Sequence, residues 1–168
     1  MIEKFKTLFF VKSSLISLYL ALTIPMPFIS IDQLKIPSII IFVFGLYLII
    51  NITNDYVETS KDKISYKTSF ISTTLGKKNW EVSWSDIKSI KCLPTSQGSK
   101  VYYFHTNDDE NFLVPQRVEN LEKLLLIVSK KTSIPTNYLS FISPLWTYKL
   151  LTYLSILMII GEIIAFLN

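Results

Sequence analysis

Two long stretches of apolar residues lie near the start of the chain, separated by a short polar link. Ser13–Ile29 and Ile36–Ile52 contain no charged side chain over 17 residues each. A helix that crosses a bilayer needs roughly 17 to 25 such residues, so each stretch is long enough. The link Ser30–Lys35 is too short for anything but a tight reversal. The pattern therefore predicts an antiparallel transmembrane hairpin.

A third apolar stretch, Leu150–Leu167, predicts another span, and Trp146 and Tyr148 precede it as residues typical of a membrane interface. Glu162 interrupts this stretch and is a candidate intramembrane polar residue. It has two interpretations: a functional carboxylate inside the membrane, or a side chain that reaches to the nearby interface. We favour the second, because Glu162 lies only six residues from Asn168.

Between the hairpin and the last span the pattern changes to alternation of apolar and polar residues, which is typical of antiparallel strands. Trp80, Val82 and Trp84 alternate with polar residues, so we expect all three on one face, directed into a core. Gly76–Asn79 is expected to form a turn. The other expected strands are 55–59, 63–69 with an extended continuation to 75, a bent strand from 86, 100–105 and 111–114.

One amphipathic helix is predicted after these strands. Its apolar stripe consists of Val118, Leu121, Leu124, Leu125 and Val128. An ion pair between Glu119 and Lys123 is expected along its surface, four residues apart. Short antiparallel strands followed by one helix are the order of a pleckstrin-homology-like (PH-like) fold.

The predicted fold class is therefore that of an α+β membrane protein. It consists of a two-helix N-terminal transmembrane hairpin, a PH-like antiparallel β domain capped by a C-terminal helix, and a third transmembrane helix. The expected boundaries are 1–53 for the hairpin, 54–133 for the β-rich domain, and 134–168 for the linker and last span.

Charge is concentrated in the middle of the chain and is nearly balanced there. The whole chain has a formal net charge of +4, but residues 54–133 hold twelve Lys and Arg against ten Asp and Glu. That balance lacks the concentrated positive field that binding to a nucleic-acid backbone requires. The N-terminus and the middle domain are both lysine-bearing and flank the hairpin, so the positive-inside tendency predicts that both are cytoplasmic and that the C-terminus is not.

The sequence carries no recognisable catalytic motif, and we expect no enzyme activity, metal, cofactor or small-molecule substrate. His105 and Cys92 are the only residues of their types and belong to different expected strands. We interpret His105 as a solvated strand-end residue and Cys92 as a small core residue. The acidic turn Thr106–Glu110 is interpreted as a solvated hairpin tip rather than a calcium site.

The loop that carries Lys77, Lys78 and Asn79 is the main candidate for a membrane- or partner-facing surface. Lysines beside an anionic membrane are each attracted by roughly 1 kcal/mol when favourably placed. A second candidate surface surrounds Tyr102, Tyr103 and Phe104, where a partner strand would add to a sheet edge. The alternative for that run is that its odd-numbered members are core residues and the even ones cover the other face.

Three segments carry a resemblance to a known family: Asp86–Lys91, Asp109–Phe112, and a closing helix that leads into Ile134 and Pro135. In this order, behind two spans, they resemble bacterial membrane-anchored PH-like proteins. More narrowly they resemble the photosystem I assembly factor of cyanobacteria and chloroplasts that has two N-terminal spans. The third span departs from that family.

The resemblance implies a non-enzymatic protein of the thylakoid or plasma membrane that helps assemble or stabilise a membrane complex. Its partners would be membrane lipids and the subunits of a complex such as a photosystem. We therefore expect an integral membrane scaffold, and the alternative is a small subunit of a membrane transport complex with Glu162 as its polar residue.

Overall fold

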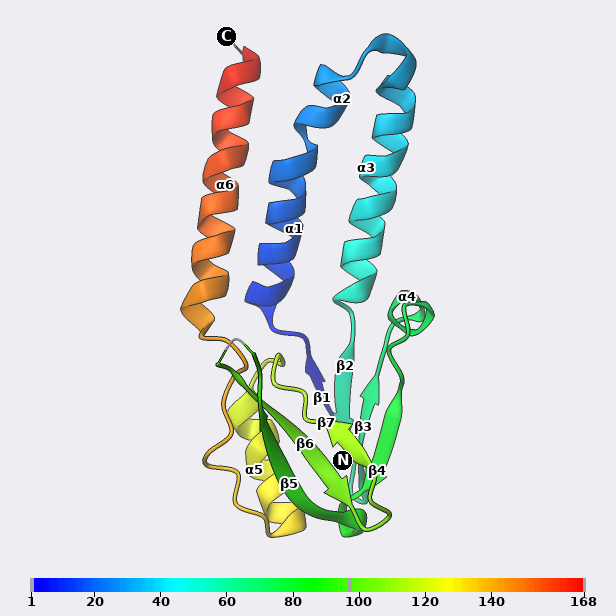
Figure 1. Ribbon diagram of the computed structural model, residues 1–168, viewed down its shortest axis with the longest axis vertical. Helices are drawn as coiled ribbons and strands as arrows, with labels where there is room; N and C mark the ends of the chain where they lie inside the picture. Colours follow the sequence, from blue (N-terminus) through cyan, green and yellow to red (C-terminus); the bar gives the residue numbers. More distant parts are fainter. Residues whose placement is uncertain (1, 97, 168) are drawn as a thin grey trace. The chain divides into compact units, whose positions relative to one another are not determined.

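The chain forms two compact units in a computed structural model that describes residues 2–96 and 98–167 (Figure 1). The first unit contains the N-terminal residues up to Leu8 together with Asn54–Pro144, and the second contains Phe9–Thr53 and the residues from Leu145 onward. This division differs from the predicted boundaries of 1–53, 54–133 and 134–168. The chain ahead of the first span and the segment after residue 133 both join the β-rich unit.

The first unit begins with a sheet of four antiparallel strands in sequence order. They are β1 (Glu3–Lys6), β2 (Tyr56–Thr59), β3 (Lys63–Lys67) and β4 (Trp80–Ser83). β1, which precedes the first span, pairs with β2 so that Lys6 lies opposite Tyr56. No strand was predicted there, because four residues of which three are charged give no clear alternation. The two segments on either side of the hairpin therefore form one sheet.

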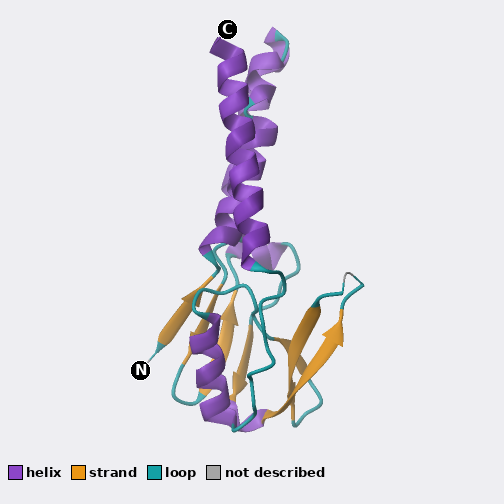
Figure 2. Ribbon diagram, turned by 90° about the vertical axis from the view of Figure 1, so that its left-hand side faces the viewer, coloured by secondary structure: helices purple, strands orange, loops and turns teal. Residues whose placement is uncertain are grey.

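A second, three-stranded antiparallel sheet follows. It contains β5 (Ile87–Pro94), β6 (Lys100–Thr106) and β7 (Asn111–Leu113), with β6 in the centre. The 3-10 turn η1 (Trp84–Asp86) connects the two sheets, and the register shifts between Ile87 and Ser89, which accounts for the predicted bend in this strand. Figure 2 shows the two groups of strands in orange.

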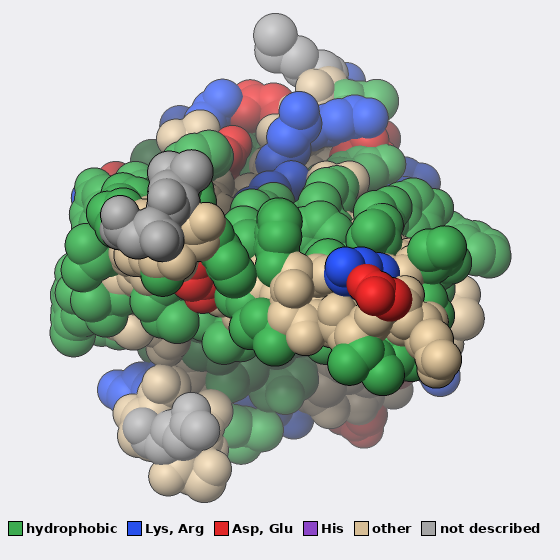
Figure 3. Space-filling view, turned by 90° about the horizontal axis from the view of Figure 1, so that it is seen from above, with side chains coloured by type: hydrophobic (Ala, Val, Ile, Leu, Met, Phe, Trp, Pro, Cys, Tyr) green, Lys and Arg blue, Asp and Glu red, His purple; other side chains and the backbone are tan. Residues whose placement is uncertain are grey.

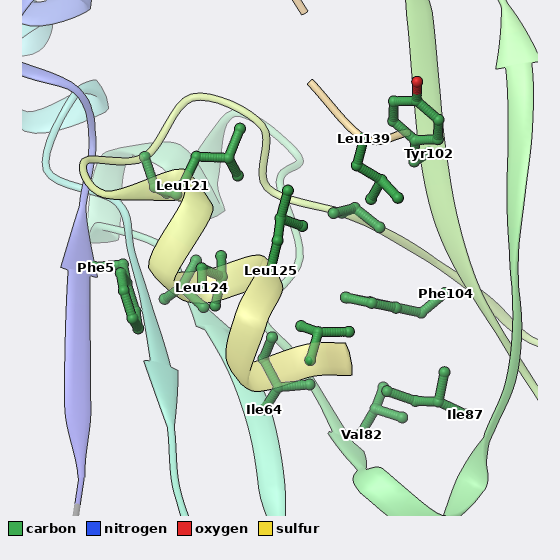
Figure 4. Close-up of a cluster of buried hydrophobic side chains, with 14 of the residues drawn as sticks. Phe5, Ile64, Val82, Ile87, Tyr102, Phe104, Leu121, Leu124, Leu125 and Leu139 are labelled. Atoms are coloured by element: carbon green, nitrogen blue, oxygen red, sulfur yellow. The ribbon is translucent and has the colours of Figure 1, made fainter. Parts of the chain in front are cut away.

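Helix α5 (Leu121–Thr132) supplies the core between the sheets. Its leucines lie between Phe5 of the first sheet and Phe104 of the second (Figure 4). The predicted apolar stripe is buried throughout, although the helix begins at Leu121 and Val118 precedes it. Since Glu119 also lies outside the helix, the expected pair with Lys123 is wrong; Lys123 instead binds Glu3 of β1 at 2.5 Å.

The segment Phe70–Leu75 differs from the extended conformation predicted for it. Residues Phe70–Thr74 form a short helix, α4, and the Ser69 hydroxyl accepts the backbone N–H of Ser72 at its start. Serine at this position satisfies a helix donor that would otherwise be unpaired. In a segment of only five residues, the conformation is determined by this capping hydrogen bond and not by the pattern of apolar residues.

The second unit consists of α1 (Phe9–Thr23), α2 (Pro25–Ile29), α3 (Asp32–Ile52) and α6 (Leu145–Leu167). Three helical segments are long and apolar enough to cross a membrane: Phe9–Ile29, Asp32–Ile52 and Leu145–Phe166. The end-on view in Figure 3 shows hydrophobic side chains over much of these helices. The predicted α+β class with an apolar hairpin, antiparallel sheets and a third apolar helix is confirmed.

Small side chains allow α1 and α6 to pack closely and in parallel. Ser14, Ser17 and Ala21 of α1 are buried, as is Ser155 of α6, and the hydroxyls of Ser13 and Thr152 lie 3.4 Å apart. Small residues are common at helix contacts in membranes, where they let the backbones approach. α1 also contacts α3, where the Tyr19 hydroxyl donates to the carbonyl of Phe42 at 2.8 Å.

Candidate functional site

The outer face of the first sheet is polar and internally paired. Lys4 binds Glu58 at 2.8 Å and Lys63 binds Glu81 at 2.6 Å, across neighbouring strands. Cross-strand pairs of opposite charge stabilise a sheet and leave few apolar atoms for a partner. This face is therefore well suited to water.

The outer face of the second sheet has the opposite character. Leu93 lies opposite Val101, and Tyr103 lies opposite Leu113, so these four side chains share one face across three strands. Leu93 and Leu113 are about half exposed, at 54% and 48%, and Val101 and Tyr103 are partly exposed. We call these four residues the β5–β7 apolar face. The exposed Lys91 also lies on this face, opposite Tyr103. Exposed apolar side chains gathered on one face and bordered by polar residues are typical of an interaction surface.

The predicted surface around Tyr102, Tyr103 and Phe104 is partly wrong. Tyr102 and Phe104 are fully buried in the core, and Tyr103 alone of the three lies on the outer face. The even-numbered members, not the odd ones, therefore point inward. β6 is paired on both sides, so it offers no free edge; the open edges of this sheet belong to β5 and β7.

The predicted loop residues Lys77, Lys78 and Asn79 are exposed, but two of them have structural partners. The Lys77 ammonium binds Asp55 at 2.7 Å. The Asn79 side-chain oxygen accepts both the backbone N–H of Thr68, at 2.6 Å, and its hydroxyl, at 2.8 Å. Lys78 makes no ion pair within the described part of the chain and is the one side chain of the three that is free to meet a ligand.

Asp55 organises this loop, although no role was predicted for it from the sequence. Its side chain is 4% exposed and accepts from the hydroxyl of Tyr66 at 3.0 Å, the backbone N–H of Ser69 at 2.9 Å, and Lys77. Burial alone would raise the pKa of Asp55, but hydrogen bonds from Lys77, Ser69, Ser72 and Tyr66 outweigh it and hold the pKa below its ordinary value. Burial, reinforced by the charge of Asp55, raises the pKa of Tyr66.

Glu162 lies on α6, partly buried within the second unit. Its Oε2 atom is buried and has no hydrogen-bond partner among the described residues. A polar oxygen in this condition is costly inside a membrane and is typically retained for a partner or a function.

His105 and Cys92 both differ from their predicted environments. His105 is buried, with Nδ1 3.1 Å from the side-chain oxygen of Asn111 and Nε2 3.4 Å from Asp109. Cys92 is exposed, although it lies opposite the buried core residue Tyr102, so its interpretation as a core residue is wrong. Among residues 2–96 and 98–167 no group of three His, Cys, Asp or Glu side chains is placed to hold a metal.

The chain is similar in sequence to a cyanobacterial protein. No family model matches the chain. A protein of Synechocystis sp. strain PCC 6803, the uncharacterized protein slr0269, is 30% identical over 156 residues, which cover 88% of this chain and 77% of that protein. The chain belongs to the slr0269 family. The shared region is long enough to include most of both units.

Proposed function

We propose that this member of the slr0269 family is a membrane-anchored interaction protein that helps assemble or stabilise a membrane protein complex and has no catalytic activity of its own. The observation that carries the proposal is the β5–β7 apolar face, which lies on a folded unit attached to three apolar helices. Aromatic and aliphatic side chains clustered in this way are the usual anchors of protein interfaces.

The proposed domain type is PH-like. Four antiparallel strands, three more antiparallel strands and a closing helix, in this order, support it. We place the domain and the N-terminus in the cytoplasm and the C-terminus across the membrane. The pairing of β1 with β2 supports a common side for the first two, and their lysines support the cytoplasmic side.

The proposed partners are subunits of a photosynthetic complex, with a photosystem as the first candidate, in the thylakoid or plasma membrane. The cyanobacterial relative supports this context, because it covers most of the chain. Membrane lipids are the second class of partner, and no nucleic acid or small-molecule substrate is proposed.

The test is co-purification of partners from cyanobacterial membranes in mild detergent, with the tagged full-length protein and mass spectrometry. The variant Tyr103→Lys with Leu113→Lys places two charges on the β5–β7 apolar face, and we expect it to lower recovery of photosystem subunits about tenfold or more. The control Ser83→Lys with Ser85→Lys adds the same charge at exposed positions off this face. Equal recovery with both variants, or no membrane-complex subunit with the wild type, would overturn the proposal.

A second candidate function is that of a small subunit of a membrane transport complex. The buried, unpartnered Oε2 of Glu162 favours it. Under this proposal Glu162→Gln changes a measured ion or solute flux in membranes that contain the complex. Asp32→Asn, which alters an exposed acid that pairs with Lys35, is the control. An unchanged flux in Glu162→Gln removes the basis for this function.

A further inference from the structure

The short helix α4 exposes two large apolar side chains that the core does not use. Phe70 is 85% exposed and Leu75 is 67% exposed, on either side of a run of serine and threonine. We call residues 68–79 the α4 loop. A phenylalanine that is this exposed contributes no hydrophobic free energy to folding, because its surface stays in water unless something outside the unit covers it.

The register of the first sheet places the α4 loop at the end where the chain meets the apolar helices. Lys6 lies opposite Tyr56, and Tyr56 lies opposite Lys67. The first apolar helix begins at Phe9, and the second ends at Ile52. Only a few residues therefore separate the sheet from the two spans, and the α4 loop follows directly after Lys67.

These short connections are themselves held by hydrogen bonds. The backbone N–H of Leu8 donates to the carbonyl of Arg117 at 2.8 Å, and the hydroxyl of Thr7 donates to the carbonyl of Asp55, also at 2.8 Å. The unit is thus ordered up to the residue before the first apolar helix. Few residues therefore remain between the ordered end of this unit and the start of the first apolar helix.

Asp55 ties the α4 loop to the same place. It binds the loop near its beginning, through the N–H of Ser69 at 2.9 Å, and near its end, through Lys77 at 2.7 Å. Asp55 comes three residues after the end of α3 at Ile52. A loop fastened at both ends to this residue is therefore held close, along the chain, to the end of the second apolar helix.

The charge at this end of the unit is complementary to an anionic surface. Lys6, Lys78 and Arg117 are exposed and form no ion pair within the described residues. The acids nearby are the buried Asp55, already neutralised by Lys77, and the partly buried Glu119, whose N–H donates to the carbonyl of Lys6. The net charge of the exposed side chains at this end of the unit is therefore positive, as expected of a surface that faces anionic lipid.

We propose that the α4 loop is a membrane-interface anchor that inserts Phe70 and Leu75 between the lipids of the bilayer that the spans cross, with Lys78 and Arg117 against anionic headgroups. Apolar insertion together with electrostatic attraction is how amphipathic surface segments hold to membranes. The anchor goes beyond the proposed scaffold function and does not depend on which protein partner is bound.

The test uses the full-length protein in vesicles of phosphatidylcholine and phosphatidylglycerol. Cys92→Ser removes the native thiol, and Thr74→Cys on α4 receives an environment-sensitive fluorophore. Ser85→Cys is the matched site, exposed in η1 beyond Ser83, at the opposite end of the sheet. A lipid spin-labelled near its headgroup is expected to quench the Thr74→Cys label about threefold more than the Ser85→Cys label.

A second comparison separates insertion of the α4 loop from the mere proximity to lipid that its covalent connection to the apolar helices provides. Phe70→Ser with Leu75→Ser leaves the core untouched, because both side chains are exposed. We expect it to bring quenching at Thr74→Cys down to near the Ser85→Cys level, and we expect pure phosphatidylcholine vesicles to reduce it partly. Equal quenching at the two sites would overturn the proposal. Strong quenching at Thr74→Cys that persists in the Phe70→Ser, Leu75→Ser variant would also overturn it, since the covalent connection to the apolar helices alone would then explain the quenching.

Discussion

At the scale of single residues, Asp55 shows how a buried charge is tolerated when both of its carboxylate oxygens accept hydrogen bonds. Burial disfavours its charged form, and the donors from Lys77, Ser69 and Tyr66 more than compensate. In the sequence Asp55 is an acid three residues after the end of an apolar stretch. Its partners lie up to 22 residues away, so the sequence alone does not show the cluster.

The first prediction concerns the pH dependence that Asp55 confers. Its folded-state pKa is below the ordinary value, so its stabilisation is present above about pH 4 and is lost as the pH falls through the folded-state pKa. Asp55→Asn is expected to lower the free energy of unfolding at neutral pH by about 1.5–3 kcal/mol. The difference from the wild type narrows in acid. Urea unfolding in mild detergent, followed by the fluorescence of Trp80 and Trp84, measures both.

The exposed turn residue Asp108 provides the control for this experiment. Asp108→Asn removes a carboxylate without a buried partner, so its stability should follow that of the wild type at every pH. A gap between Asp55→Asn and the wild type that stays constant down to pH 3 would contradict the assigned role of the charge.

The second prediction compares two glycines within apolar helices. A Cβ on Gly45 would overlap the Tyr19 hydroxyl, whereas a Cβ on Gly161 meets nothing within 4 Å. Gly45→Ala must therefore displace Tyr19 from the Phe42 carbonyl, at a cost of about 1–3 kcal/mol. Gly161→Ala should be neutral or slightly stabilising, because alanine favours the helix. Thermal melts of the detergent-solubilised protein, followed by circular dichroism, distinguish the two; equal melting temperatures would rule out a tight α1–α3 contact.

At the scale of elements, β1 is the part of the fold that most changes how the soluble unit must be defined. It supplies a whole edge of the first sheet and the core residue Phe5, although it lies ahead of the first span. A fragment that starts at residue 54 lacks both. A fragment that keeps β1 can be made by joining residues 8 and 54 with a short linker. These ends lie close together, because the hydroxyl of Thr7 and the carbonyl of Asp55 are hydrogen-bonded at 2.8 Å.

The third prediction follows from this. Residues 2–8 joined to 54–144 by a short Gly/Ser linker should fold cooperatively, and 54–144 alone should be less stable by about 3–5 kcal/mol, the usual cost of losing a buried phenylalanine. Phe5→Ala in the linked protein should reproduce most of that loss. Urea unfolding of the soluble fragments provides the measurement, and equal midpoints for the two fragments would show that β1 is dispensable.

The elements that the sequence predicted well are those with a strong periodic signal. Three apolar stretches and the stripe Leu121–Val128 correspond to helices, and the alternation at Trp80–Trp84 correctly places these side chains toward the core. β1 and α4 were not predicted, because segments of five residues or fewer carry too little periodicity. The conformation of β1 depends on its pairing with β2, which is distant in sequence. The conformation of α4 depends on its serine N-cap. The β5–β7 apolar face was missed because it depends on cross-strand register.

At the scale of the whole molecule, the three candidate spans and the pairing of β1 with β2 limit the membrane topologies that the chain can adopt. The proposed arrangement puts the N-terminus and the β-rich unit on the cytoplasmic side, and the α2–α3 turn and the C-terminus on the other. Cys92 is exposed in the β-rich unit, and Lys35 is exposed in the first turns of α3, so the two sites report on opposite sides.

The fourth prediction uses these sites with a membrane-impermeant maleimide. The native Cys92 should react in vesicles with the cytoplasmic face outward, whereas Lys35→Cys in a Cys92→Ser background should react only in vesicles of the opposite orientation. Detergent permeabilisation should make both sites reactive and serves as the control. Labelling of both sites from one side would exclude the hairpin as a pair of spans.

The position of β1 also has a consequence for how the protein is made. β1 leaves the ribosome before either span, and β2 follows only after both; at typical synthesis rates the interval is on the order of several seconds. If the first two apolar helices cross the membrane, β1 and β2 can pair only when these helices return the chain to the side of the membrane on which β1 lies. Under the proposed topology, a chain with a mis-inserted hairpin leaves the β2 edge unpaired, and an unpaired strand edge favours aggregation and proteolysis. Under the proposed topology, folding of the β-rich unit therefore depends on the orientation of the first two apolar helices.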